Sequence, residues 1–249
     1  MSIDERLAVD EASDFTEAEI KIRDEILSTF PDEQRQNLLK DAYGTLTLIR
    51  AYQKENPRIE KSRQFIQAIV AWRDHVDVNS ILDRRLDRDE EFHSKWPERI
   101  YGVDKYGHMI FGFKISDIDR DGLLEFTDDE LQRLQGQRLE ARKALKAEIF
   151  ARTGIRRYKH TAIIDVSTVT VSMLGGQRTA LLKRISQIGG QNYPETVWKI
   201  YLVNAPMMFR AVWAVIRQML HPVTVAKVSI LGSSSAATIE KDGAFSKAG

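Results

Sequence analysis

The stretch "WKIYLVNAPMMFRAVWAVIRQMLHPVTVAKVSIL", residues 198–231, decides the fold that we expect for this chain. It begins and ends with short runs that are apolar at consecutive positions, and a helical segment lies between them. Upstream, "TAIIDV" at 161–166 is followed in the same manner by a helical pattern over 177–188. Apolar strands separated by helices indicate a parallel sheet that is buried on both faces. The sequence therefore predicts an α/β lobe with helices flanking a mainly parallel sheet.

The helical segment at 207–220 is apolar on nearly every side. Its polar residues are Arg210, Arg217 and Gln218. A surface helix normally carries a broad polar face, which this segment does not have. At roughly 1.5 Å per residue it is about 21 Å long, whereas a helix needs about 20 apolar residues to cross a bilayer. The segment is thus too short to span a membrane and too apolar to face water alone.

The first part of the chain has helical periodicity. "TEAE" at 16–19 predicts a helix start, because Thr16 and Glu19 can form a capping box. "IEKSRQFIQAIVAWRDHV" at 59–76 repeats apolar residues at threes and fours. After Pro97 the pattern changes, and "DKYG" at 104–107 predicts a tight connection between two strands. We expect four segments: a disordered tail at 1–14, an N-terminal helical lobe at 15–96, the α/β lobe at 97–235 and a short C-terminal tail at 236–249.

The bulk composition excludes several classes of function. The chain has 249 residues, 43% apolar and 29% charged, with a formal net charge of +1 and no cysteine. The lack of cysteine excludes disulfides, thiolate metal sites and cysteine nucleophiles, and the near-neutral charge gives no reason to expect a nucleic-acid partner. The N-terminus shows no apolar signal segment, and no apolar run is long enough for a membrane span. We expect a cytoplasmic protein.

The sequence gives little support for catalysis or for a metal. Neither G-x-S-x-G nor H-E-x-x-H occurs, and Asp165, at a strand end, fits a turn cap better than a catalytic acid. "DIDRDGLLEFTD" matches part of a calcium loop through four carboxylates: Asp117, Asp119, Asp121 and Asp128. The last of these is shorter than the usual bidentate Glu, and a strand pattern precedes the motif. We expect no enzyme activity, no metal and a solvated acidic loop, with calcium binding through 117–128 as an alternative.

Glu195 and Lys227 each precede one of two strands in the opening stretch. In a parallel sheet, residues that precede neighbouring strands meet at the same edge. Two interpretations stay open at this point. The pair is either a surface salt bridge of little energetic value or the polar mouth of an apolar cavity that holds an amphiphile.

The blocks "QNYPETVWKIYLVNAP" and "HPVTVAKVSILGSS", within residues 191–234, resemble the CRAL-TRIO lipid-binding family, in particular its phosphatidylinositol/phosphatidylcholine transfer branch. Weaker similarity extends through "IIDV", "DKYGHMI" and "LIRAYQKENPRIEKSRQFIQAIVAWR". The resemblance implies an N-terminal helical lobe followed by an α/β lobe, whose sheet floors an apolar lipid pocket. It also implies that the helix at 207–220 is a mobile gate over that pocket.

The resemblance also implies a set of site residues. Glu195 and Lys227 match the pair that binds the inositol head group, Thr224 matches a nearby hydroxyl contact, and Tyr193 matches a tyrosine of the phosphatidylcholine site. The gate helix would contribute five residues: Phe209, Arg210, Trp213, Ile216 and Arg217. The choline-lipid site departs from the family at three positions where small hydroxyl residues are expected: His160, Ala162 and Gly189. The chain also lacks the family's L-P-x-x-x-G-G segment near its end.

We therefore expect a non-catalytic protein that binds phosphatidylinositol and transfers or presents it between membranes. The resemblance implies a bound lipid and no other cofactor, and its partners would be phospholipid and a transient membrane surface. We expect a monomer that associates peripherally with membranes from the cytoplasm. Two alternatives remain: a lipid-sensing regulatory module without transfer activity, and a calcium-responsive adaptor that uses the acidic loop at 117–128.

Overall fold

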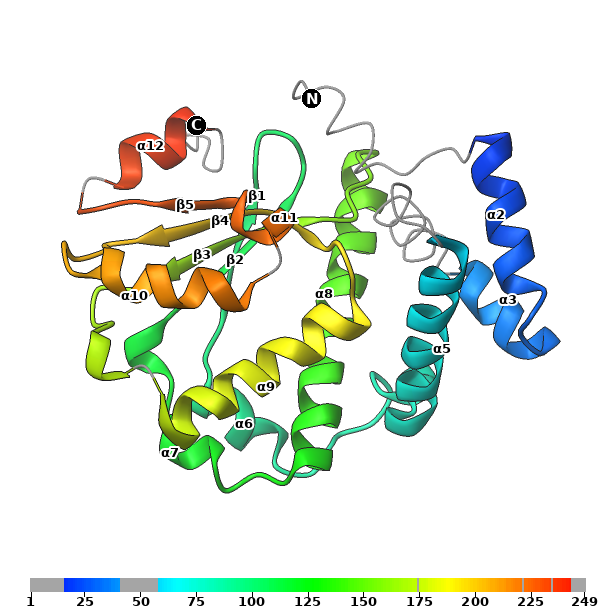
Figure 1. Ribbon diagram of the computed structural model, residues 1–249, viewed down its shortest axis with the longest axis horizontal. Coiled ribbons are helices and arrows are strands. Elements are labelled where there is room, and N and C mark those ends of the chain that lie inside the picture. Colours follow the sequence, from blue (N-terminus) through cyan, green and yellow to red (C-terminus); the bar gives the residue numbers. More distant parts are fainter. Residues whose placement is uncertain (1–15, 41–57, 174, 221, 234, 243–249) are drawn as a thin grey trace.

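The computed structural model describes residues 16–40, 58–173, 175–220, 222–233 and 235–242. Helices from the N-terminal part lie to one side, and a five-stranded sheet with its flanking helices forms the rest of the molecule (Figure 1). The expected tail at 1–14 falls outside the described residues, and so does the last part of the tail at 236–249.

The N-terminal helices form as their sequence signals predict. They are α2 (Glu17–Leu27), α3 (Asp32–Lys40) and α5 (Arg58–Val76). The predicted capping box opens α2: the backbone N–H of Glu19 donates to the Thr16 hydroxyl at 3.3 Å, and the Glu19 carboxylate accepts from the Thr16 N–H at 2.8 Å. α2 packs against α5 through one buried apolar cluster: Ile22, Ile26, Leu27, Phe30, Ile66 and Ile69.

The sheet has five strands, which lie side by side in chain order: β1 (Arg99–Val103), β2 (Met109–Lys114), β3 (His160–Asp165), β4 (Val197–Val203) and β5 (Val228–Ile230). β1 and β2 are antiparallel, and every other neighbouring pair is parallel. The turn between β1 and β2 is closed by a hydrogen bond of 2.8 Å from the Asp104 N–H to the His108 carbonyl, as "DKYG" predicts. The mainly parallel α/β fold is confirmed.

Among the described helices α8 is the longest; it begins with a second capping box and ends at a glycine. The Thr127 hydroxyl and the Glu130 carboxylate cap each other's backbone N–H groups, and Gly154 closes the helix with a φ of 70°, a left-handed conformation that suits glycine. The helices after α5 are α6 (Asp89–Lys95), α7 (Arg120–Leu123), α8 (Asp128–Thr153), α9 (Gly176–Asn192), α10 (Phe209–Ile216), α11 (Pro222–Val225) and α12 (Ser235–Lys241). Four single 3-10 turns accompany them: η1 (Val78–Ser80), η2 (Ile115–Asp117), η3 (Val171–Met173) and η4 (Arg217–Met219).

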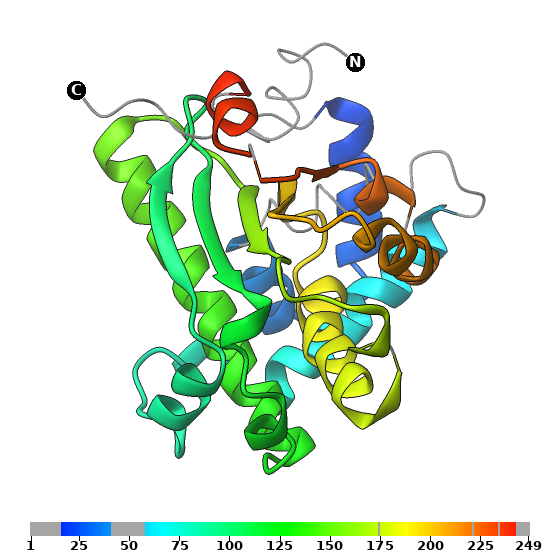
Figure 2. The same cartoon turned by 90° about the vertical axis from the view of Figure 1, so that its left-hand side faces the viewer.

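Helices cover both faces of the sheet. Because side chains alternate along a strand, Ile200 and Leu202 of β4 point to one face and Tyr201 and Val203 to the other. Ile200 lies in the cluster that packs against α8 and also in the cluster that packs against α10. On the opposite face, Tyr201 and Val203 pack against Ile239 of α12. Figure 1 shows α10 and α12 on opposite sides of the sheet, and Figure 2 shows the β1–β2 hairpin alongside α8.

Candidate functional site: a charged pair and a covering helix

The structure brings Glu195 and Lys227 together at one edge of the sheet. The Lys227 ammonium donates a hydrogen bond of 3.0 Å to Glu195 Oε2, and the two side chains are 17% and 32% exposed, Lys227 being the more buried. Glu195 directly precedes the turn into β4, and Lys227 directly precedes β5. Glu195 also has a φ of 57°, a left-handed conformation that is costly for a residue with a side chain. The placement at a shared edge is the one that the parallel strands predict.

Thr224 lies beside this pair, one helical turn before Lys227. Its backbone carbonyl accepts a hydrogen bond of 3.0 Å from the Lys227 N–H, so α11 sets the position at which Lys227 enters the sheet edge. The Thr224 side chain is half-buried. The structure therefore joins Glu195 and Lys227 through their side chains and places Thr224 next to Lys227 through a backbone hydrogen bond; these are three of the four residues that the resemblance assigns to the head-group site.

Tyr193, the fourth residue, is committed to a different set of contacts. Its side chain is buried, and its hydroxyl donates a hydrogen bond of 2.7 Å to Oε1 of Glu140 on α8. The same carboxylate oxygen accepts a hydrogen bond of 3.0 Å from Arg73 of α5. The Tyr193 ring also meets Trp72 of α5 edge-on, with 5.8 Å between the ring centroids. Tyr193 thus links the N-terminal helices to the turn that carries Glu195, a connection that sequence reasoning missed.

His160 begins β3 at the same edge of the sheet. Its backbone N–H donates to the Thr196 carbonyl at 2.9 Å, and its ring lies edge-on to Phe111 with centroids 5.0 Å apart. The side chain is buried, and Nδ1 has no hydrogen-bond partner. Burial, followed by the positive charges of Lys146 and Arg142, lowers the pKa of His160 well below its usual value. The imidazole is therefore neutral around pH 7.

α10 covers the face of the sheet next to this edge. Phe209 and Val212 are fully buried in a cluster with Val166, Val169 and Leu202, and Trp213 and Ile216 are partly buried against the same cluster. The regular helix is shorter than the predicted 207–220, because it begins at Phe209 and passes into the 3-10 turn η4 at Arg217. Val212 is the most buried residue of the helix, although it is not among the five gate residues that the resemblance implies.

The outer side of α10 carries the predicted pair of cations and several exposed apolar side chains. Arg210 and Arg217 are both exposed, so their side chains face water. The exposed apolar residues of this segment are Met207, Met208, Val215 and Leu220. Among the described residues, no helix has both the length and the apolar character needed to cross a membrane.

The segment before α10 is tied to the end of β3. Asn204 has a φ of 55°, and its side-chain amide donates a hydrogen bond of 2.9 Å to Asp165 Oδ2. The other carboxylate oxygen of Asp165 accepts from the Ser167 N–H at 2.9 Å. Burial favours a higher pKa for Asp165, but the hydrogen bonds from Ser167 and Asn204 outweigh it, and the pKa is lowered. Asp165 therefore caps a turn, as the sequence indicates, and its contact with Asn204 fixes the chain shortly before α10.

The acidic loop at 117–128 is divided among separate contacts. α7 occupies its middle, and Asp119 caps this helix by accepting from the Gly122 N–H at 2.9 Å. Three of the carboxylates each meet a different cation: Asp119 with Lys95, Asp121 with Arg178, and Asp128 with Arg184. Within the part of the chain that the structure describes, no group of His, Cys, Asp or Glu side chains is arranged to hold a metal ion. In this geometry the carboxylates lie in separate ion pairs and not around one point.

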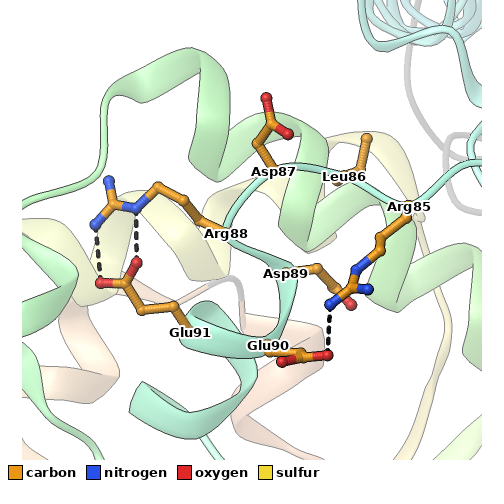
Figure 3. A pocket seen from close by; sticks show the side chains of 7 residues that line it. All are labelled: Arg85, Leu86, Asp87, Arg88, Asp89, Glu90 and Glu91. Atoms are coloured by element: carbon orange, nitrogen blue, oxygen red, sulfur yellow. Dashed lines mark hydrogen bonds and ion pairs between the residues drawn. The ribbon is translucent and has the colours of Figure 1, made fainter.

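A shallow polar hollow of about 380 Å³ lies elsewhere, at the loop that leads into α6 (Figure 3). Its lining runs from Arg85 to Glu91, and none of the predicted lipid-binding residues takes part. The charges pair within the loop: Arg88 donates to both oxygens of Glu91 at 2.8 and 2.9 Å, and Arg85 donates to Glu90 at 2.6 Å. This hollow lacks the apolar lining that a lipid tail needs.

Comparisons with known proteins agree with this architecture. The sequence model of the CRAL/TRIO domain matches residues 93–243. The phosphatidylinositol/phosphatidylcholine transfer protein SFH9 of Arabidopsis thaliana is 29% identical over 192 residues, which cover 75% of this chain and 33% of that protein. The SEC14 cytosolic factor of Yarrowia lipolytica is 25% identical over 199 residues, which cover 78% of this chain and 40% of that protein.

A solved structure shows the same fold. The crystal structure of Sfh5 superposes with a TM-score of 0.58 at 18% sequence identity, covering 75% of this chain and 62% of that one. This chain spans only about one third of the length of SFH9 and of SFH7, a second transfer protein of Arabidopsis thaliana that it matches. The shared region includes both the charged pair and α10, because the matched domain begins before β1 and ends beyond β5.

Proposed function

The chain is a member of the CRAL/TRIO domain family, a family of lipid-binding domains, and on that premise we propose that it binds phosphatidylinositol and transfers it between membranes. The plant relatives are named as phosphatidylinositol/phosphatidylcholine transfer proteins, which supports this class of ligand. The proposed activity involves binding and release alone, without covalent chemistry. The protein would act as a monomer at the cytoplasmic surface of membranes.

The observation that carries the proposal is the ion pair of Lys227 and Glu195 at the sheet edge. A lysine ammonium is a suitable partner for a phosphodiester, and a carboxylate accepts hydrogen bonds from hydroxyl groups. A head group that offers both an anionic phosphate and several hydroxyls fits such a pair better than a uniformly charged one. Inositol joined through a phosphodiester has this combination.

The acyl chains would lie between the sheet and α10. Ile164 and Ile200 belong to the two central parallel strands and pack in the cluster beneath α10, yet both remain only half-buried. Apolar residues at the centre of a covered sheet are usually excluded from water. Their partial exposure supports incomplete packing beneath the helix, which would leave room for apolar chains.

Transfer of labelled phosphatidylinositol from donor to acceptor vesicles tests the proposal. Lys227→Ala should abolish exchange, because the phosphate loses its cation. Lys199→Ala is a matched control, since Lys199 lies on β4 and forms its own ion pair with Asp242 near α12. Equal exchange by the two variants would contradict the proposal. Binding of phosphatidylinositol without exchange by the unmodified protein would favour the lipid-sensing alternative instead.

A further inference from the structure

Two adjacent methionines lie exposed where the chain enters α10. Met207 is 96% exposed and Met208 is 56% exposed, whereas Met109, the first residue of β2, is 1% exposed. Among the described residues, no other large apolar side chain is as open to water as that of Met207. The pair follows Pro206 directly and precedes Phe209, which anchors the first turn of the helix in the core.

The chemistry of these side chains differs from that of other exposed apolar residues. A thioether sulfur is oxidised by peroxides to a sulfoxide, which is polar, and reductases reverse the change. The whole chain contains no cysteine, so no thiol competes for the oxidant. Exposure decides which methionine reacts, and it favours Met207 and Met208 over Met109.

We propose that Met207 and Met208 form a reversible oxidation site, and that their conversion to sulfoxides weakens the contact of α10 with membranes and slows lipid exchange. In each step hydrogen peroxide transfers one oxygen to sulfur: the S=O bond forms, the O–O bond breaks and water leaves. The sulfur loses two electrons and the peroxide gains them. The inference rests on the proposed function, because it assigns these side chains to the membrane-facing side of α10.

The structure separates the effect of oxidation on the membrane contact from an effect on the fold. Phe209 and Val212 pack α10 against the sheet, and both are buried. The side chains of Met207 and Met208 are exposed and take no part in this packing. A polar oxygen on a side chain that already faces water leaves this packing intact. Its cost arises only where the side chain meets an apolar environment. Oxidation should therefore leave the melting temperature unchanged while it lowers association with vesicles.

Limited treatment with hydrogen peroxide, followed by peptide mass spectrometry, tests the chemical step. Met207 and Met208 should gain oxygen first and Met109 last. Exchange of labelled phosphatidylinositol is then measured before and after treatment. The rate after treatment should be about one tenth of the rate before it. Methionine sulfoxide reductase should restore the rate. Earlier oxidation of Met109 would overturn the assignment of the site.

A double variant, Met207→Leu with Met208→Leu, keeps the apolar side chains but removes both sulfurs. Its ratio of treated to untreated rates should stay near one, whatever its basal rate. Met173→Leu is the control, because the half-buried Met173 accepts a hydrogen bond through its sulfur from the Thr170 N–H, and this variant should remain sensitive. An unchanged rate after verified oxidation of both methionines would overturn the inference alone, whereas absence of exchange before treatment would overturn the proposed function and the inference together.

Discussion

Exchanging the charges of Glu195 and Lys227 separates what their ion pair contributes to stability from what it contributes to binding. The perturbation is the double variant Glu195→Lys with Lys227→Glu. It keeps two opposite charges at the same sheet edge, so the attraction between them is preserved. It moves the cation from the start of β5 to the turn before β4. A phosphate that binds at the original position of the ammonium would then meet a carboxylate.

The structure sets the size of the two effects. Exposed ion pairs contribute about 0–1 kcal/mol, and breaking a fully buried pair costs about 3–5 kcal/mol. Since the side chains of Lys227 and Glu195 are 17% and 32% exposed, Lys227→Ala should lower the free energy of unfolding by about 1–2 kcal/mol. A hydrogen bond between charged groups contributes about 1.5–3 kcal/mol to binding, so the same variant should weaken phosphatidylinositol binding by about 10- to 150-fold.

Glu195→Lys alone, Lys227→Glu alone, the charge-swapped variant and the original protein form a double-mutant cycle. Urea denaturation gives the free energy of unfolding, and vesicle exchange gives the transfer rate. We expect the swapped variant to recover most of the stability lost by the single variants while its exchange remains as low as that of Lys227→Ala. Recovery of both stability and exchange would refute the reasoning, because the pair would then act only as a structural contact.

Three further predictions concern the surroundings of the pair. Trp213→Glu should lower vesicle association and exchange about tenfold or more, since a carboxylate at this partly buried position is costly in the closed and membrane-bound states; normal exchange would exclude α10 as the covering helix. Tyr193→Phe leaves the Glu140 carboxylate with Arg73 as its hydrogen-bond donor, and urea denaturation should show a loss of about 1 kcal/mol. The pKa of His160 in the folded protein lies well below 6.5, so the unfolded chain takes up a proton first as the pH falls below about 6.5. The free energy of unfolding should therefore decline by up to about 1.4 kcal/mol per pH unit in this range. His160→Leu should remove this part of the pH dependence, and an unchanged pH profile of the free energy of unfolding would contradict the prediction.

The parts of the structure that depend on local pattern could be predicted from the sequence. Consecutive apolar residues gave the parallel strands, because a strand covered on both faces has no polar side. Thr16 and Glu19 gave the start of α2, because a capping box involves only neighbouring residues. The contact between Glu195 and Lys227 could also be predicted, because neighbouring parallel strands begin at a common edge of the sheet.

The parts that depend on packing between distant segments could not be predicted. Tyr193 and Glu140 are 53 positions apart in the chain, and no periodic signal relates a tyrosine after one helix to a buried acid within another. His160 Nδ1 likewise lacks a hydrogen-bond partner because of the side chains that β2 and α8 place around the ring, among them Phe111. Nearly every residue of α10 is apolar, so the sequence does not indicate which side of the helix faces the sheet. The buried Val212 could therefore not be distinguished from exposed neighbours such as Val215.

β4 runs from the charged pair to the segment that precedes α10, and the residues at its two ends adopt the same backbone conformation. Glu195 before the strand and Asn204 after it both have a left-handed backbone, which costs about 1–2 kcal/mol for an ordinary residue and less for asparagine. Each is held by a side-chain contact from a neighbouring strand: Lys227 holds Glu195, and Asp165 holds Asn204. β4 is paired with β3 over most of its length and with β5 at Ile200, Tyr201 and Leu202, so it cannot shift without breaking backbone hydrogen bonds on both sides. If the proposed lipid site is correct, release of the lipid from beneath α10 would begin at Asn204 and the residues that follow it, while the proposed head-group contacts would stay fixed at the other end of the strand.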